Sequence, residues 1–179
     1  NENIFYRASN YFSLSPIHYC MTKDDFIICA KLYTPNLLRF SKRVAGNTIE
    51  ASDIVQDCFE VLWKNKEKVE MNSAKPFLFS VAHKKLIDSL RSDVKMQDFD
   101  SVFSELTTKP DDTDAVQLVK IAIDQIPALY KELLTLRDLE SYSYKEIETI
   151  TGLSENQVKV YLFRARKAIK EQILQLEVL

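Results

Sequence analysis

The chain has 179 residues, of which 46% are apolar, so it can bury one or two hydrophobic cores and is not disordered throughout. Only 2 glycines and 5 prolines occur, which disfavours β-rich folds, whose turns need glycine, and glycine-rich phosphate loops. The composition therefore predicts an all-α protein. No stretch reaches the roughly 20 consecutive apolar residues of a membrane-spanning helix, and no signal-peptide pattern is present. We therefore expect a cytoplasmic protein.

Cysteine and histidine usage argues against metal and redox chemistry. The three cysteines, Cys20, Cys29 and Cys58, form no C-x-x-C pair, a scatter that a reducing compartment tolerates. His18 and His83 have no second histidine or cysteine at helical spacing, so no zinc ligand set is available. No nucleophile stands beside a general base. We expect no enzyme activity, no metal, no cofactor and no small-molecule substrate.

The net charge is only −2, but the acidic excess is confined to one stretch. Residues 96–119 contain six acidic residues and one basic residue, and Pro110 with a weak apolar pattern indicates an exposed linker. The sequence thus predicts two small helical domains joined by an acidic linker. The segments are an N-terminal extension at 1–21, whose native status stays open, a first domain at 22–95, the linker at 96–114 and a second domain at 115–179.

The spacing of apolar residues predicts four helical segments in the first domain, at 22–34, 36–45, 52–66 and 76–92. Thr22 and Asp25 form a capping pair at the first of these. Pro35 predicts a break or a kink that separates the first segment from the second. Gly46 suits the left-handed residue that ends a helix.

Two of these segments have charged outer faces. The segment 52–66 aligns acidic residues with a glutamine beside them: Asp53, Gln56, Asp57 and Glu60. The segment that begins at Pro76 aligns Lys84, Asp88, Arg91 and Lys95, with Lys85 and Ser89 adjacent. From the residues alone, ordinary solvation of a helix explains both faces.

In the second domain, local signals predict a helix-turn-helix. After helices at 115–125 and from Pro127 onward, Ser143 with Glu146 forms a capping box, and Ser154 with Gln157 forms another. Gly152 falls where a helix that ends in a left-handed residue needs glycine. Two helices therefore meet across a three-residue turn.

The second helix of this motif is the most basic run in the chain, because no acidic residue occurs between Asn156 and Lys170. In a helix-turn-helix, the start of the second helix enters the major groove, where amides and cations meet base edges and phosphates. A solvated basic helix is the alternative, but the coincidence of caps, glycine and charge favours DNA binding. The candidate DNA-binding residues are Asn156, Gln157, Lys159, Tyr161, Arg164, Arg166 and Lys167.

These motifs resemble the extracytoplasmic-function (ECF) sigma factors of bacterial RNA polymerase. ASDIVQDCFEVLWKNKEKV and KPFLFSVAHKKLIDSLRS are similar to region 2 of that family, and IPALYKELLTLRDLESYSYKEI through VKVYLFRARKAIKEQI is similar to region 4. The resemblance covers about residues 25 to 175 and implies a dissociable polymerase subunit. Region 2 would recognise the minus-10 promoter element, and region 4 would recognise the minus-35 element.

The resemblance also implies a role for each face. The acidic face, with Trp63 near it, corresponds to the surface for the clamp helices of the polymerase beta-prime subunit, and region 4 is expected to meet the beta flap. The stripe of Lys84, Lys85, Asp88, Ser89, Arg91 and Lys95 corresponds to the minus-10 helix. The loop at 69–74 corresponds to the segment that accepts a flipped base. Family members are commonly inhibited by an anti-sigma factor, often one anchored in a membrane.

The main alternative is a helix-turn-helix transcriptional regulator whose helical N-terminal domain acts as a sensor. A phosphorylatable receiver would need alternating strands and helices, whereas residues 25–95 predict helices only. Association with core polymerase separates the two hypotheses, because a simple regulator binds duplex DNA without it.

Overall fold

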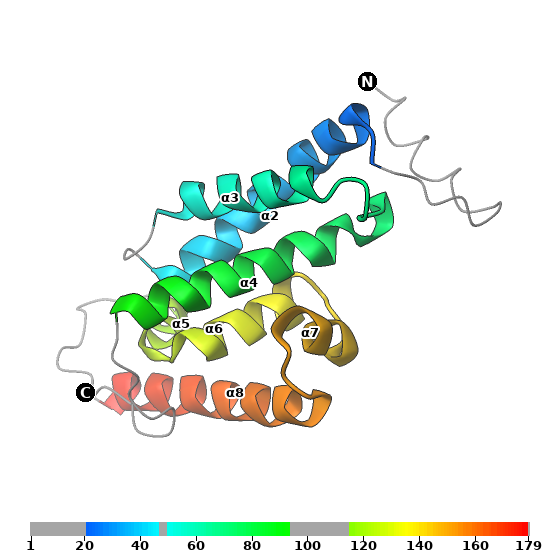
Figure 1. The fold of residues 1–179 in the computed structure, drawn as a ribbon. Helices are drawn as coiled ribbons and strands as arrows, with labels where there is room; N and C mark the ends of the chain where they lie inside the picture. The colour runs from blue at the N-terminus through cyan, green and yellow to red at the C-terminus, as the bar shows by residue number, and fades with distance from the viewer. Residues whose placement is uncertain (1–20, 47–49, 94–114, 179) are drawn as a thin grey trace, which may run out of the picture.

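The computed structural model describes residues 21–46, 50–93 and 115–178, and within them every regular element is helical. Helix α4 packs against α2 and α3 on one side and against α7 on the other, while α6 packs against α2. Helix α8 forms the outermost layer beneath α6 and α7 (Figure 1). No helix among the described residues is long and apolar enough to cross a membrane.

Helix α2, Lys23–Ala45, begins at Thr22, whose side chain accepts a hydrogen bond from the Asp25 amide in a complete capping box. The helix continues through Pro35, so the predicted break there is wrong, while a kink at Pro35 stays a prediction. Proline in a helix interior costs about 3 kcal/mol, but fully burying a leucine and a phenylalanine stabilises by about 1.5–3 kcal/mol each. Leu37 and Phe40, both 0% exposed, lie within the next helical turns after Pro35. Their burial therefore favours one continuous helix.

The rest of the first half follows the predicted pattern closely. Gly46 ends α2 with a φ of +63°, and its amide donates to the Lys42 carbonyl at 3.0 Å. Helix α3 spans Ala51–Lys64, and a short 3₁₀ turn, η1, spans Met71–Ser73 before α4, Ala74–Asp93.

The second half begins with α5, Ala115–Gln125, the same bounds as the apolar pattern predicts. Pro127 precedes α6, Ala128–Leu134, which continues into a π-helical turn, η2, at Thr135–Leu139. Helix α7, Tyr144–Thr151, and helix α8, Glu155–Val178, complete the chain.

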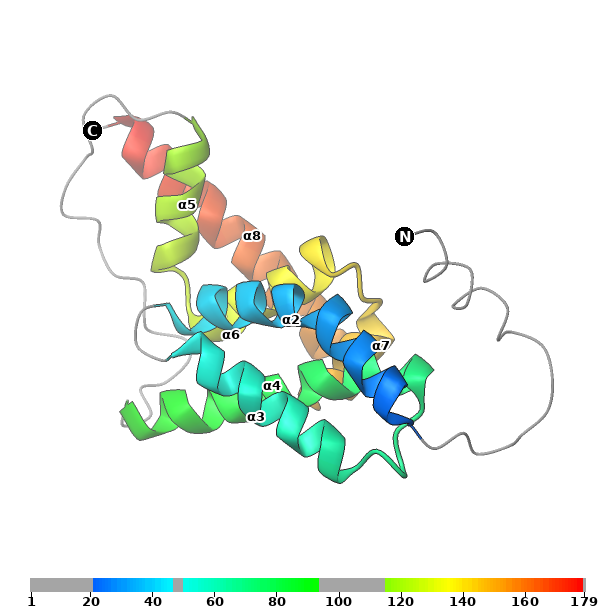
Figure 2. The ribbon, with the colours of Figure 1, turned by 90° about the horizontal axis from the view of Figure 1, so that it is seen from above.

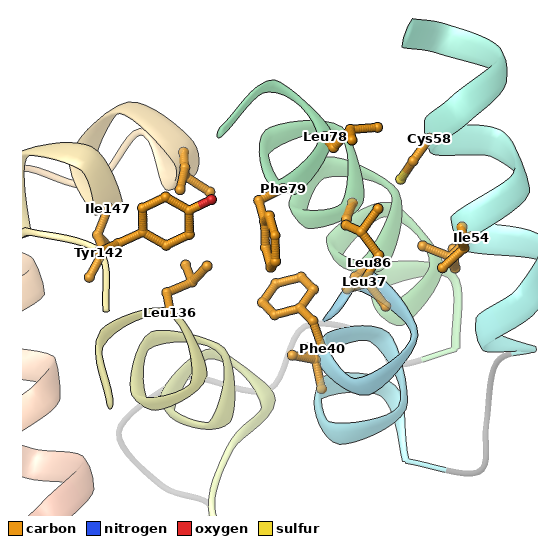
Figure 3. Close-up of a cluster of buried hydrophobic side chains, with 14 of the residues drawn as sticks. Leu37, Phe40, Ile54, Cys58, Leu78, Phe79, Leu86, Leu136, Tyr142 and Ile147 are labelled. Atoms are coloured by element: carbon orange, nitrogen blue, oxygen red, sulfur yellow. The ribbon is translucent and has the colours of Figure 1, made fainter. Parts of the chain in front are cut away.

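One hydrophobic core joins the two halves. Phe79 of α4 lies between Phe40 of α2 and Tyr142, with ring centroids 5.1 Å and 5.6 Å away and both pairs edge to face (Figure 3). Such aromatic pairs contribute about 0.5–1.5 kcal/mol each beyond the area they bury. The same cluster includes Leu136 and Ile147 from the second half. The two predicted helical units therefore pack directly on each other.

Polar contacts accompany this core. The Glu140 carboxylate, 6% exposed, accepts a hydrogen bond from the Asn36 amide at 2.8 Å and pairs with the Lys75 ammonium at 3.1 Å. Lys75 also lies 4.8 Å from the centroid of the Tyr142 ring. Burial and the nearby Glu140 carboxylate raise the pKa of Tyr142, so this phenol stays neutral at physiological pH.

A smaller cluster of buried side chains, Ile126, Tyr130, Ala165 and Ala168, attaches α8 to the segment around α5 and α6. Helix α5 and the end of α8 project together from the main body (Figure 2). The described residues leave out residues 1–20 of the predicted extension at 1–21, the whole predicted linker at 96–114, and Lys95.

Candidate nucleic-acid interface

The helix-turn-helix has the geometry that its sequence predicts. The Ser143 hydroxyl accepts from the Glu146 amide, and the Glu146 carboxylate accepts from the Ser143 amide at 2.7 Å. The Ser143 hydroxyl also donates to the Glu146 carboxylate at 2.7 Å, and this bond together with that from the Ser143 amide lowers the pKa of Glu146. Gly152 adopts the left-handed conformation with φ +75°, which glycine reaches at little cost. Two helices thus meet across residues 152–154.

The start of α8 is fixed in the same way. The Gln157 side chain accepts a hydrogen bond from the Ser154 amide at 2.9 Å, and the Ser154 hydroxyl accepts from the Gln157 amide at 3.3 Å. Val158 and Leu162 are buried against Ile147 and Ile150 of α7. This small core orients α8 so that its opposite face meets solvent.

That opposite face contains nearly all the candidate DNA-binding side chains. Lys159 pairs with Glu155 at 2.7 Å, Lys167 with Glu171 at 3.6 Å, and Arg166 with Asp138 at 2.8 Å. Exposed pairs of this kind contribute only about 0–1 kcal/mol, so a phosphate backbone can compete for these cations. The exposed candidate residues on this face are Asn156, Gln157, Lys159, Arg164, Arg166 and Lys167.

Tyr161 differs from the other candidates because it is only partly exposed. Its ring centroid lies 6.1 Å from that of Tyr130, and it packs against both hydrophobic clusters. Sequence reasoning missed two apolar residues on the outer face of α8, Val160 and Phe163, which are 46% and 69% exposed. Helical spacing from the buried Val158 and Leu162 is the signal that could have found them.

The candidate stripe on α4 is described only in part. Lys84 and Asp88 are exposed, while Lys85 and Ser89 are half-buried. Arg91 lies within α4, but its side chain is not among those described, and Lys95 is outside the described residues. The described part therefore presents both cations of the stripe's first turn, Lys84 and Lys85.

The acidic face lies on α3, with Asp53, Gln56 and Glu60 exposed and Asp57 half-buried. Trp63 is half-buried, its ring 5.0 Å from that of Phe26, with the Lys66 ammonium 4.0 Å from its centroid. Trp63 thus packs against α2 while it borders the acidic face. Helix α3 and helix α8 lie on opposite sides of the molecule (Figure 1).

The acidic face and the α4 stripe adjoin each other. The Lys85 ammonium donates a hydrogen bond to the Asp57 carboxylate at 2.6 Å, and both side chains are 42% exposed. This hydrogen bond raises the pKa of Lys85. The two surfaces, of opposite charge, therefore share an ion pair at their border.

The described residues hold no cluster of histidine, cysteine and carboxylate side chains that could bind a metal ion. Cys29 and Cys58 are free and buried. Burial raises the pKa of Cys29 to about 11 and that of Cys58 to about 12. Both thiols are therefore protonated at neutral pH and act as small apolar side chains.

Two family models match the chain. Residues 29–95 match the family model for sigma-70 region 2, and residues 118–169 match the model for sigma-70 region 4. The chain therefore belongs to the sigma-70 family of transcription initiation factors, with region 2 formed by α2 to α4 and region 4 by α5 to α8.

Its curated relatives define the subgroup as the ECF sigma factors. The chain is 28% identical to the ECF RNA polymerase sigma factor SigM of Bacillus subtilis over 156 residues, which cover 84% of this chain and 94% of that one. It is 28% identical to SigV of the same organism over 158 residues, covering 85% and 93%. The ECF sigma factor SigL of Mycobacterium tuberculosis is 28% identical over 151 residues, covering 79% and 85%.

A solved structure has the same fold. The sigma factor RpoE of Bartonella quintana, crystallised with the anti-sigma factor NepR, matches with a TM-score of 0.65 at 22% identity. The match covers 84% of this chain and 97% of that one.

Proposed function

We propose that α8 reads the minus-35 promoter element in the major groove. The capped turn at 152–154 presents the start of α8 outward, where Asn156 and Gln157 can meet base edges and the cations can meet phosphates. Tyr161, half-buried beside Tyr130, would support the helix from behind. The proposed DNA contacts are Asn156, Gln157, Lys159, Arg164, Arg166 and Lys167, and Tyr161 is the proposed supporting residue.

The minus-10 element is assigned to α4 and the turn before it. Lys84 and Lys85 would hold phosphates. Asn72 and Ser73, in the exposed turn directly before α4, are candidates to receive an unstacked base. Extruding a base costs a few kcal/mol, which contacts from this turn would offset. The contact set is Lys84, Lys85, Asp88, Ser89, Arg91 and Lys95.

The acidic face of α3 is assigned to core RNA polymerase. Carboxylates repel a DNA backbone but complement a basic protein surface, and the beta-prime clamp helices are the partner proposed for this face. Trp63 adds an aromatic anchor of the kind enriched at protein interfaces. The contact set is Asp53, Gln56, Asp57, Glu60 and Trp63, while region 4 would meet the beta flap.

Two further properties belong to the proposal. An anti-sigma factor is a proposed partner, supported by a chain of the same fold that was crystallised with one. The chain would act in the cytoplasm with the polymerase, and its role would be binding and not catalysis.

The single observation that favours this function over a simple regulator is the presence of two oppositely charged surfaces on region 2, next to each other. A sensor domain needs neither of these two surfaces. The test is a pull-down with core polymerase using the wild-type chain and Asp57→Lys. We expect wild type to bind and Asp57→Lys to bind at least tenfold more weakly, with DNA binding by α8 unchanged. Equal core affinity of the two chains would refute the assignment of α3.

A further inference from the structure

The ion pair between Asp57 and Lys85 joins two surfaces that the proposed function gives to different partners. Asp57 on α3 belongs to the proposed polymerase surface, and Lys85 on α4 belongs to the proposed minus-10 surface. Their side chains meet at 2.6 Å between the packed helices α3 and α4, although the two residues are far apart in sequence. The pair is therefore a product of the tertiary fold and not of helical spacing.

The charged residues named next, which lie near this pair, form no ion pair between the described parts of α3 and α4. Among the described residues, neither Asp53 nor Lys84 forms an ion pair, and both are exposed. Glu60 pairs with Lys64 on its own helix. Asp57 and Lys85 are thus the members of the two surfaces that neutralise each other.

We propose that Asp57 holds Lys85 back from DNA in the free chain, and that polymerase releases Lys85 by taking Asp57 for its own basic surface. This inference rests on the proposed function and adds a coupling between its two partners. A cation cannot give its full charge to a phosphate while a carboxylate neutralises it at hydrogen-bond distance. Once a basic partner surface competes for Asp57, the Lys85 ammonium becomes available.

The size of the effect follows from the exposure of the pair. Half-exposed ion pairs are weak, so releasing Lys85 should change DNA affinity by about 1.5- to 5-fold. Coupling is reciprocal, so DNA would strengthen polymerase binding by the same factor through this pair. The Asp57–Lys85 pair would therefore influence the order in which the chain binds polymerase and DNA, but it would not determine that order alone.

The test compares two substitutions that change charge equally. Asp57→Asn frees Lys85, whereas Asp53→Asn removes one negative charge from the same face and leaves the pair intact. The full-length chain is titrated into a fluorescein-labelled, mixed-sequence 15-nucleotide single-stranded DNA, and binding is followed by fluorescence anisotropy at several salt concentrations. We expect Asp57→Asn to bind about 1.5- to 5-fold more tightly than Asp53→Asn, with a salt slope steeper by about 0.7.

The same comparison in a Lys85→Gln background identifies the cause. There the two asparagine variants should bind the strand equally, because no ammonium remains to be released. Equal binding by Asp57→Asn and Asp53→Asn in the Lys85 chain would overturn the inference, as would a difference that persists in Lys85→Gln.

Core affinity, measured on the same variants, separates this inference from the proposed function. Both asparagine variants should lose core affinity. If they do, and their strand binding is the same, the coupling fails while the polymerase surface stands. If neither loses core affinity, the polymerase surface fails and the coupling fails with it.

Discussion

Glu132 on α6 has none of its surface exposed, and its Oε1 atom lies 2.5 Å from Nδ1 of His83 on α4. The His83 side chain is 17% exposed, so this hydrogen bond lies inside the contact between regions 2 and 4. A buried carboxylate is costly unless a partner compensates it. His83 therefore stabilises the packing of the two regions, and this pair is a direct probe of it.

Glu132→Ala removes this carboxylate and its hydrogen bond with His83. We expect the free energy of unfolding to fall by about 1–3 kcal/mol. Denaturant unfolding, monitored by circular dichroism, measures this free energy of unfolding. Asp124→Ala, which removes an exposed carboxylate nearby along the chain, serves as the control and should stay within about 0.5 kcal/mol of wild type. Equal stability of the two variants would show that the contact between the regions does not depend on Glu132.

Phe79→Ala tests whether the two regions share one core. Phe79 touches Phe40 of region 2 and Tyr142 of region 4, so its loss should cost about 3–5 kcal/mol and lower a single calorimetric transition. Phe163→Ala, at a 69% exposed position, is the matched control and should change stability by less than about 0.5 kcal/mol. Two separate transitions, of which Phe79→Ala shifts only one, would contradict the shared core.

Lys159→Ala and Arg164→Ala test the assignment of α8. Each should weaken binding to duplex promoter DNA and reduce the slope of log affinity against log salt by about 0.9, because each removes one phosphate contact. Lys120→Ala removes an exposed cation from α5 and should leave the slope nearly unchanged. If all three variants bind alike, the proposed role of α8 in DNA binding is wrong.

Thiol labelling tests the burial of Cys29 and Cys58. Because burial raises the pKa of both thiols, to about 11 and about 12, almost no thiolate forms at neutral pH. In a Cys20→Ser chain, we expect no reaction with iodoacetamide until denaturant is added, and then modification of both residues, counted by mass spectrometry. Rapid labelling of the folded chain would contradict the core described for region 2.

The sequence predicted local structure well and long-range structure poorly. Capping residues and apolar spacing predicted the turn at 152–154 and the bounds of α5, because these signals act within a few residues. The break predicted at Pro35 does not occur, because burial of Leu37 and Phe40 outweighs the cost of proline in a helix. Local sequence patterns do not reveal this burial, since it depends on the whole fold.

The same limit applies to the sites. The charged faces of α3 and α4 were predicted from helical spacing, but the contact between Asp57 and Lys85 depends on how the two helices pack. The pairing of Glu132 with His83 joins residues 49 positions apart, which no local pattern indicates. Val160 and Phe163, which are exposed on α8, were not considered, because only polar and charged residues were sought on that face.

As a sigma factor, this chain gives core RNA polymerase its choice of promoter. Runoff transcription with core enzyme on a library of promoter fragments, with and without the chain, measures this choice. We expect transcripts from a defined subset of fragments only when the chain is present, and their loss with Asp57→Lys. A chain that binds duplex DNA but leaves core polymerase unable to initiate on any fragment would contradict the claim.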